Sequence, residues 1–387
     1  MESGKRTELS RTEMRLRDPF ELPFREPSEI VNMLKERNLG IPDDEVEHAE
    51  FWVKTVGYYH LKGYLSCLKE PVQHRFYRNG TRFSDAISIL KWERSLRSVL
   101  LEQIGKVELR LRAAIVETMG GEHGDGYLRN ENFDSKLWMS TKRSRDGESE
   151  WGAIERKMNR QLTNMFSEFN YPWIENFKQR RSNQIVPIWM FLETISFGEL
   201  VDFYLALKKE HRTNIAQEFA NPNFADGILL EDESRRIFLV LKDFRNLASH
   251  YQPFFDKEWL FQALTSDRKS FVNCPFFPSL NANRKHCRIY EVILILLFLE
   301  PSFQRDSNWP SEIEALIDRF PNSKTSGVSP EILGVPKAWK RRQPWAKDLP
   351  NGSLPQAFFS TDPKDRKKKD AGKKGRTREF RKKRDIY

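Results

Sequence analysis

Cysteine is scarce in this sequence. Cys67, Cys274 and Cys287 lie far apart and form no C-x-x-C pair. Such an odd, sparse set argues against a disulfide framework or a zinc knuckle and is typical of a reducing compartment. Long apolar runs are also missing, since the longest, residues 292–299, falls far short of the roughly 20 residues that span a bilayer. The charged stretch 1–20 lacks the apolar core of a secretory signal. These absences predict a soluble cytoplasmic protein with no membrane partner.

Alternating patterns of β-branched residues, which predict half-buried strands, are scarce as well, and no repeat of fixed period is present. Helical patterns are abundant instead. The longest covers residues 84–119 and, at about 1.5 Å per residue, predicts a helix of roughly 50 Å. Residues 71–82 predict a loop or short hairpin, and residues 121–150 predict a loop insertion. The sequence therefore predicts an all-α protein.

Changes in composition divide the chain into four parts. We expect a mobile N-terminus (1–19), a helical body (20–308, with its core at about 84–300), an extended segment packing on that body (309–347) and a basic disordered tail (348–387). Charge is concentrated in the last part. Residues 364–387 hold 13 Lys or Arg and 4 Asp or Glu, which gives +9 of the chain's net +10. The body is nearly neutral, so the charge that attracts partners lies in the tail.

A polar cluster, Arg245, Asn246 and His250, ends a strongly apolar helical pattern just before Pro253. Asn246 and His250 are four residues apart and share a helix face. On a regular helix Arg245 points about 140° away from His250. Its long side chain must therefore wrap around, or the helix must deform, before the two can serve one site. Spacing alone also fits an ordinary helix end in which Arg245 pairs with Asp243 and the histidine packs under a turn.

These residue types suit the cleavage of RNA. The 2′-OH of RNA attacks its own 3′-phosphate when a base removes its proton and an acid protonates the leaving 5′-oxygen. Histidine, with a reference pKa near 6.5, can take either role. Arg245 can hold the phosphate and stabilise the charge of the transition state, while Asn246 can orient the imidazole of His250. One histidine does not readily act as base and acid in the same step, so a second copy of the chain is a natural completion.

Five segments of the chain occur in the same order as similar segments of a known protein family. They are GYYHLKGY at 57–64, WERSLR at 92–97 with Val107, Glu108 and Arg112, PIWM at 187–190 with SFGEL at 196–200, RNLASH at 245–250, and LGVP at 333–336 with Trp339 and Trp345. Together they resemble the Abi-like family of bacterial abortive-infection proteins (the AbiD/AbiF type), over roughly residues 22–346. This resemblance implies a HEPN-type helical bundle whose R-x4-H motif cleaves RNA without a metal or other cofactor. It favours the catalytic interpretation of Arg245 and His250.

The resemblance also implies a homodimer and RNA as partner, both as substrate and, in some members, as a small structured regulatory RNA. The residues expected to contact RNA are His60, Lys62, Arg75, Arg97, Arg112, Lys367, Lys368, Lys369, Lys373 and Lys374. Each has a plainer interpretation. Glu93/Arg97 and Glu108/Arg112 are spaced as helix-stabilising ion pairs, although the resemblance implies that some of these four residues face the active cleft and orient Arg245 or His250. The aromatic stripe at 58–64 is typical of a core, and the tail can simply aid solubility.

A second hypothesis is an RNA-binding protein that holds a structured RNA without cutting it. It draws support from two departures, since relatives often carry a second histidine where this chain has Tyr251 and an arginine where it has Pro253. A third hypothesis, a DNA-binding regulator, lacks support because the sequence contains no helix-turn-helix signature. The acids Glu231, Asp232 and Glu233 could suggest a metal site, but consecutive acids at a helix start are favoured by the helix dipole.

Overall fold

The computed structural model describes residues 24–121, 123–138, 149–167, 171–181, 185–221, 229, 231–257, 259–260, 286–304, 307–322, 327–341 and 345. The chain divides into two compact units. The first comprises Met1–Ser95 and Arg319–Pro330, and the second comprises Leu96–Asp318 and Glu331–Tyr387. The boundary falls within the longest helix, α5 (Phe83–Met119), whose existence and bounds agree with the sequence pattern.

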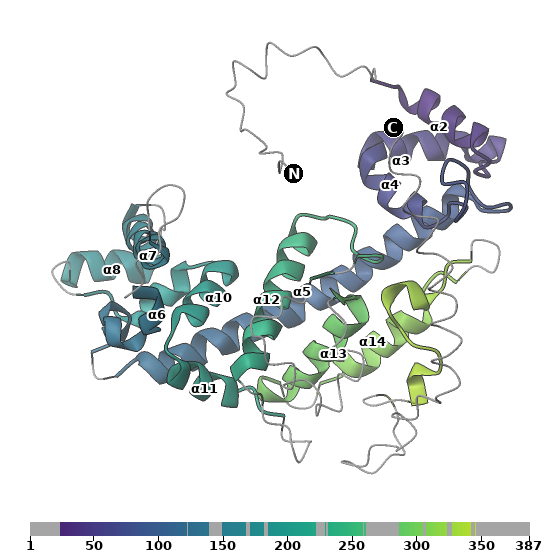
Figure 1. Cartoon of the computed structure of the whole chain (residues 1–387). Coiled ribbons are helices and arrows are strands. Elements are labelled where there is room, and N and C mark those ends of the chain that lie inside the picture. Colours follow the sequence, from purple (N-terminus) through teal and green to yellow (C-terminus); the bar gives the residue numbers. More distant parts are fainter. Residues whose placement is uncertain are drawn as a thin grey trace, which may run out of the picture. The chain divides into compact units, whose positions relative to one another are not determined.

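In the first unit, α2 (Pro27–Glu36), η1 (Asp43–Glu45), α3 (Val46–Val56) and α4 (Tyr58–Ser66) lie around the start of α5 (Figure 1). Helix α2 begins with a proline in its first turn, and the Glu29 carboxylate accepts the Glu26 backbone N–H at 2.8 Å. After α4 the chain turns back as the short hairpin that the sequence allowed, with an antiparallel bridge between Lys69 and Tyr77.

The second unit holds the rest of α5 and the remaining elements. These are η2 (Gly126–Leu128), η3 (Asn130–Asn132), α6 (Ser135–Trp138), α7 (Glu150–Ser167), α8 (Pro172–Arg181), α9 (Ile188–Phe191), η4 (Leu192–Thr194), α10 (Phe197–Ala206), α11 (Lys209–Gln217), α12 (Glu231–Ser249), β1 (Trp259–Leu260), β2 (His286–Cys287), α13 (Ile289–Leu299), η5 (Glu300–Ser302), α14 (Trp309–Asp318), η6 (Pro330–Leu333) and η7 (Trp339–Arg341). Strands β1 and β2 form one antiparallel pair. The fold is all-α, as predicted.

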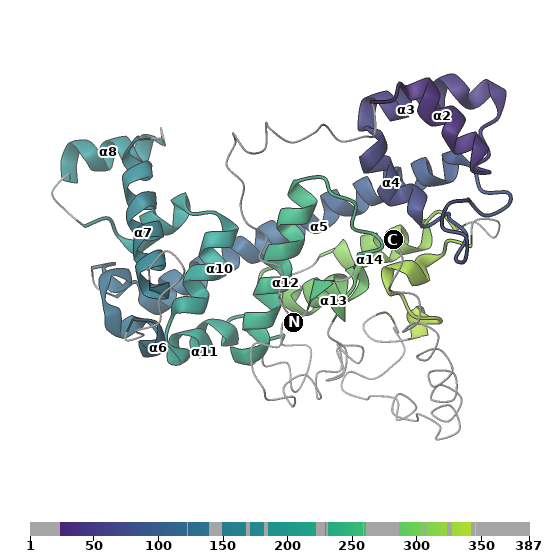
Figure 2. The ribbon, with the colours of Figure 1, turned by 45° about the horizontal axis from the view of Figure 1, so that its top comes forward.

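Helix α13 forms much of the core of the second unit, because every one of its residues is buried. A helix that is apolar on all sides must be covered on all sides. Helix α12 packs against α13, α10 and α11 (Figure 2). Trp345 adds to this core by donating its Nε1–H to the Tyr290 hydroxyl at 3.0 Å. Within the described ranges, no helix is both long and apolar enough to cross a membrane.

Two segments differ from the sequence prediction. The stretch at 121–150, expected to be a loop, includes η2, η3 and α6 where it is described. The segment from residue 309, expected to be extended, begins with helix α14. That helix buries Trp309, Ile313, Leu316 and Ile317, which recur at the spacing of one helix face. The predicted N-terminus (1–19) and tail (348–387) lie outside the described residues.

Candidate active site at the end of helix α12

Helix α12 carries Arg245 and Asn246 and is followed directly by His250, the three residues predicted to be catalytic. Its apolar face buries Ile237, Phe238, Leu241, Phe244 and Ala248, and its first turn carries three acids. The apolar spacing produces an amphipathic helix, and acids in the first turn are stabilised by the helix dipole. The buried face fixes the orientation of the helix in the unit, so its last turn projects to the surface at a defined place.

The C-terminal end of α12 is closed by a Schellman motif. The Tyr251 N–H donates to the Ala248 carbonyl at 3.1 Å, and the Gln252 N–H donates to the Leu247 carbonyl at 3.1 Å. This pattern requires a left-handed residue after the cap, and Tyr251 has a φ of 55°. Glycine or asparagine is the usual residue there, because a larger side chain is strained in this conformation. His250 is thereby placed at the C-cap, where its side chain is exposed.

Arg97 of α5 holds this turn from within the unit. Its Nη1 donates to the Ala248 carbonyl at 2.7 Å and its Nη2 to the Gln252 carbonyl at 3.0 Å. The guanidinium also lies 5.0 Å from the ring centroid of Tyr251 and 4.8 Å from that of Phe254. Only 3% of Arg97 is exposed. A buried cation at a helix C-terminus is favoured by the dipole, and its planar fork can bind two carbonyls at once. Arg97 thus fixes the backbone on both sides of His250.

The predicted catalytic residues are grouped on the last two turns of α12. Arg245 and Asn246 are half-buried, and the Arg245 Nη1 donates to the Asn246 Oδ1 at 3.5 Å. The His250 N–H still donates to the Asn246 carbonyl at 3.1 Å, so the helix remains regular up to the histidine. The deformation of the helix considered from sequence is therefore not seen before His250, and a shared site for Arg245 and His250 stays a prediction.

This helix lies within a segment that matches a known family. Residues 51–256, more than half of the chain, match the family model described as Abi-like protein. The chain belongs to the Abi-like protein family. Membership suggests a role in abortive-infection phage defence. No curated protein and no solved structure gives a significant match to the chain.

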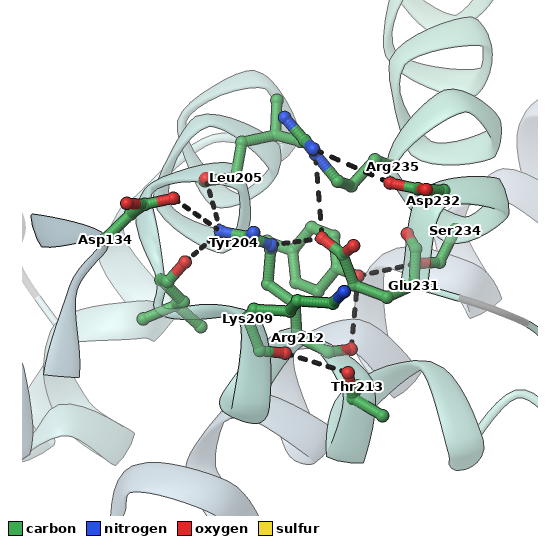
Figure 3. A network of polar contacts seen from close by, with 11 residues as sticks. Asp134, Tyr204, Leu205, Lys209, Arg212, Thr213, Glu231, Asp232, Ser234 and Arg235 are labelled. Carbon is green, nitrogen blue, oxygen red and sulfur yellow. Dashed lines mark hydrogen bonds and ion pairs between the residues drawn. The ribbon is translucent and has the colours of Figure 1, made fainter. Parts of the chain in front are cut away.

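In this Abi-like protein a second arginine holds the opposite end of α12 (Figure 3). Arg212 of α11 is buried and donates from Nε to Glu231 and from Nη1 to the Leu207 carbonyl. Its Nη1 also lies 3.9 Å from Asp134. The Tyr204 hydroxyl is 2.6 Å from the Ser234 Oγ, and burial raises the pKa of Tyr204 above its ordinary range. The first turn of α12 is therefore held by a closed polar network.

The same network bears on the metal interpretation of the acids at the start of α12. Glu231 pairs with Arg212 and lies 3.8 Å from Arg235, and Asp232 lies 3.9 Å from Arg235. These contacts give Glu231 and Asp232 structural partners within the protein. They agree with the plainer interpretation of consecutive acids at a helix start.

The residues predicted to contact RNA occupy very different places. Lys62 and Arg75 are exposed in the first unit and His60 is half-buried there. Arg112 is buried in the second unit, where its Nη2 donates to Glu108 at 2.8 Å, as expected for the plainer ion-pair interpretation. An RNA contact by Arg97 or Arg112 stays a prediction that their burial does not favour. Lys367, Lys368, Lys369, Lys373 and Lys374 lie outside the described residues.

Two features of the site were not apparent from sequence. Arg97 lies 151 positions before Ala248, and no periodicity links the two. The left-handed turn falls on Tyr251, whereas sequence signals for such a turn depend on glycine or asparagine. The only usable signal was Pro253, which indicates that the helix ends nearby. The structure adds the long-range hydrogen bonds from Arg97 to the backbone of Ala248 and Gln252.

Proposed function

We propose that this protein is a metal-independent endoribonuclease of the HEPN type and an effector of phage defence, with a composite site contributed by two copies of the chain. The observation that carries the proposal is the arrangement at the end of α12. His250 is exposed at a cap that is fixed by Arg97, and Arg245 contacts Asn246, which is four residues before the histidine. An exposed imidazole on a rigid support is what acid–base catalysis requires.

The proposed reaction is an intramolecular transesterification, in which the phosphorus atom is transferred from the 5′-oxygen to the 2′-oxygen of RNA. The 2′-oxygen forms a bond to phosphorus and the bond from phosphorus to the 5′-oxygen breaks. His250 of one copy takes the proton of the 2′-OH, and His250 of the other gives a proton to the leaving 5′-oxygen. Arg245 stabilises the negative charge on the non-bridging oxygens. The products are a 2′,3′-cyclic phosphate and a 5′-hydroxyl, so no water or redox partner takes part.

A non-cleaving RNA holder is the second candidate, and the setting of Tyr251 favours it. Where relatives often carry another histidine, this chain has a tyrosine whose ring lies 5.0 Å from the Arg97 guanidinium. An auxiliary acid is therefore replaced by a packing contact. Pro253, in the place of an arginine, similarly lacks a charge for phosphate. Under this alternative the protein binds structured RNA and leaves it intact.

One assay separates the two candidates. Purified protein is incubated with labelled single-stranded RNA in EDTA, beside His250→Ala and the matched variant His123→Ala, which removes another exposed histidine of the second unit. The nuclease proposal predicts cleavage by the intact protein and by His123→Ala, and a loss of about 100-fold or more in His250→Ala. Binding without cleavage by the intact protein would refute it in favour of the RNA holder.

A further inference from the structure

The first unit presents exposed aromatic rings beside cations. Tyr59 on α4 is 76% exposed, and the Lys62 Nζ lies 5.8 Å from its ring centroid. Phe76 on the hairpin is 38% exposed, and the Arg75 guanidinium lies 6.0 Å from its centroid. Apolar rings of this size are normally buried. Their exposure next to positive charge is the combination that binds single-stranded nucleic acid, where bases stack and phosphates pair with cations.

The cations of this unit crowd together. Burial lowers the pKa of Lys69 first, and the charges of Arg37 and Lys62 lower it further, which places all three within electrostatic reach of one another. None of Arg37, Lys62, Lys69 and Arg75 forms an ion pair with any residue that the structure describes. Lys35 differs, because it lies 3.0 Å from Asp43. A group of cations that form no ion pair favours an anionic ligand.

A shallow hollow of about 500 Å³ adjoins these residues on the hairpin. Its lining includes Phe76, one acid, Glu70, and three carboxamides, Asn38, Gln73 and Asn79. Asn38 is held in place, since its Nδ2 donates to the Tyr77 carbonyl at 3.2 Å and to the Asn79 Oδ1 at 2.7 Å. The size lies within the range of small-ligand sites. An aromatic face with amide groups around it offers both stacking and hydrogen bonds to the edge of a planar base.

We propose that the first unit is a binding site for single-stranded RNA, in which one base stacks on Phe76 in this hollow and Lys62, Lys69 and Arg75 hold the adjoining phosphates. The proposal rests on the proposed function in naming RNA as the ligand, but it concerns a surface other than the end of α12. Tyr59 provides a second stacking platform. The unit thereby gives affinity for RNA, while Arg245 and His250 perform the cleavage.

The test is fluorescence anisotropy with the full chain carrying His250→Ala, so that the probe stays intact. The probes are a labelled single-stranded RNA and the same strand with abasic nucleotides. Phe76→Leu is expected to weaken binding of the RNA by about 5-fold or more, whereas Phe76→Tyr, which keeps an aromatic ring, is expected to leave it unchanged. Neither substitution is expected to change binding of the abasic strand. Lys62→Ala is expected to reduce the slope of log affinity against log salt by about 0.7, whereas Lys35→Ala, which removes an already paired cation, leaves it unchanged.

The outcomes distinguish this site from the nuclease site. Unchanged RNA affinity in both Phe76→Leu and Lys62→Ala overturns the inference, whether or not the intact protein cleaves RNA. Equal weakening for the normal and abasic strands also overturns it, because no base is then read by Phe76. A protein that fails to cleave but shows the Phe76 and Lys62 effects retains this binding site and loses only the nuclease proposal.

Discussion

The Arg97 guanidinium donates a 2.7 Å hydrogen bond to the Ala248 carbonyl, although the two residues are 151 positions apart. This bond connects the central part of α5 to the last turn of the helix that carries the predicted catalytic residues. A second bond, to the Gln252 carbonyl, spans the exposed His250. Arg97 is therefore a positioning residue in this account, and His250 and Arg245 are the groups proposed to contact RNA.

Replacement of Arg97 by methionine keeps much of the side-chain volume and removes both hydrogen bonds. The buried Ala248 carbonyl and the partly buried Gln252 carbonyl lose their charged donor, so we expect a loss of about 2–4 kcal/mol in the free energy of unfolding. Arg97→Lys, which can reach one carbonyl, is expected to lose less. Denaturant titration checks this, with Arg94→Met as a control on the same helix because Arg94 is exposed. Equal effects of the Arg94 and Arg97 substitutions would contradict the clamp.

Arg97→Lys also tests the positioning role apart from stability. At a temperature where the variant is folded, we expect the cleavage rate to fall while the affinity for RNA stays within about twofold. The reason is that the lost hydrogen bond displaces the turn around His250 and so affects only the reaction geometry. Affinity and rate falling in parallel would instead assign Arg97 to direct RNA binding, as the family resemblance implies.

The left-handed conformation of Tyr251 predicts a clear difference between two substitutions. Tyr251→Asn and Tyr251→Val both remove the ring that contacts Arg97. Asparagine tolerates a positive φ and valine does not, so the valine variant is expected to be less stable than the asparagine variant by about 1–2 kcal/mol. Thermal and denaturant unfolding measure the difference. Two variants of equal stability would show that the turn does not require this conformation.

The buried pair of Arg212 and Glu231 predicts strong coupling at the other end of α12. Removal of one partner leaves a buried charge unpaired, at a cost of about 3–5 kcal/mol. We expect Arg212→Met and Glu231→Leu to be severely destabilising singly, and the double variant to be more stable than the sum of the single effects implies. A double-mutant cycle in denaturant gives the coupling energy. Additive effects would mean that the two residues act independently.

His211 predicts a stability change on the acid side of neutrality. Burial, aided by Lys208, lowers its pKa, and its Nε2 lies 3.0 Å from the Asn132 Oδ1. Between the lowered folded value and the unfolded value near 6.5, the unfolded chain binds more protons, so this group makes stability rise with pH in that window and level off above it. His211→Gln is expected to remove this contribution. Unfolding curves from pH 5 to 8 test it, with His74→Gln as the exposed control.

Local signals predicted much of this fold. The apolar spacing at 84–119 and the acids and apolar face of residues 231–249 specify α5 and α12 without reference to the rest of the chain. The partners of Arg97 could not be predicted, because a guanidinium that binds backbone carbonyls leaves no mark in the sequence around those carbonyls. Helix α14 was missed because its four buried residues are separated by acids and preceded by a polar segment.

The most direct test of the central claim uses an RNA strand with a single 2′-deoxy nucleotide at a mapped cleavage position, incubated with the intact protein in EDTA. The account predicts that cleavage stops at that position alone, that products elsewhere end in 2′,3′-cyclic phosphate, and that Arg245→Ala and His250→Ala lose about 100-fold or more of the rate. Cleavage that continues at the deoxy position, or that persists unchanged in His250→Ala, would contradict it.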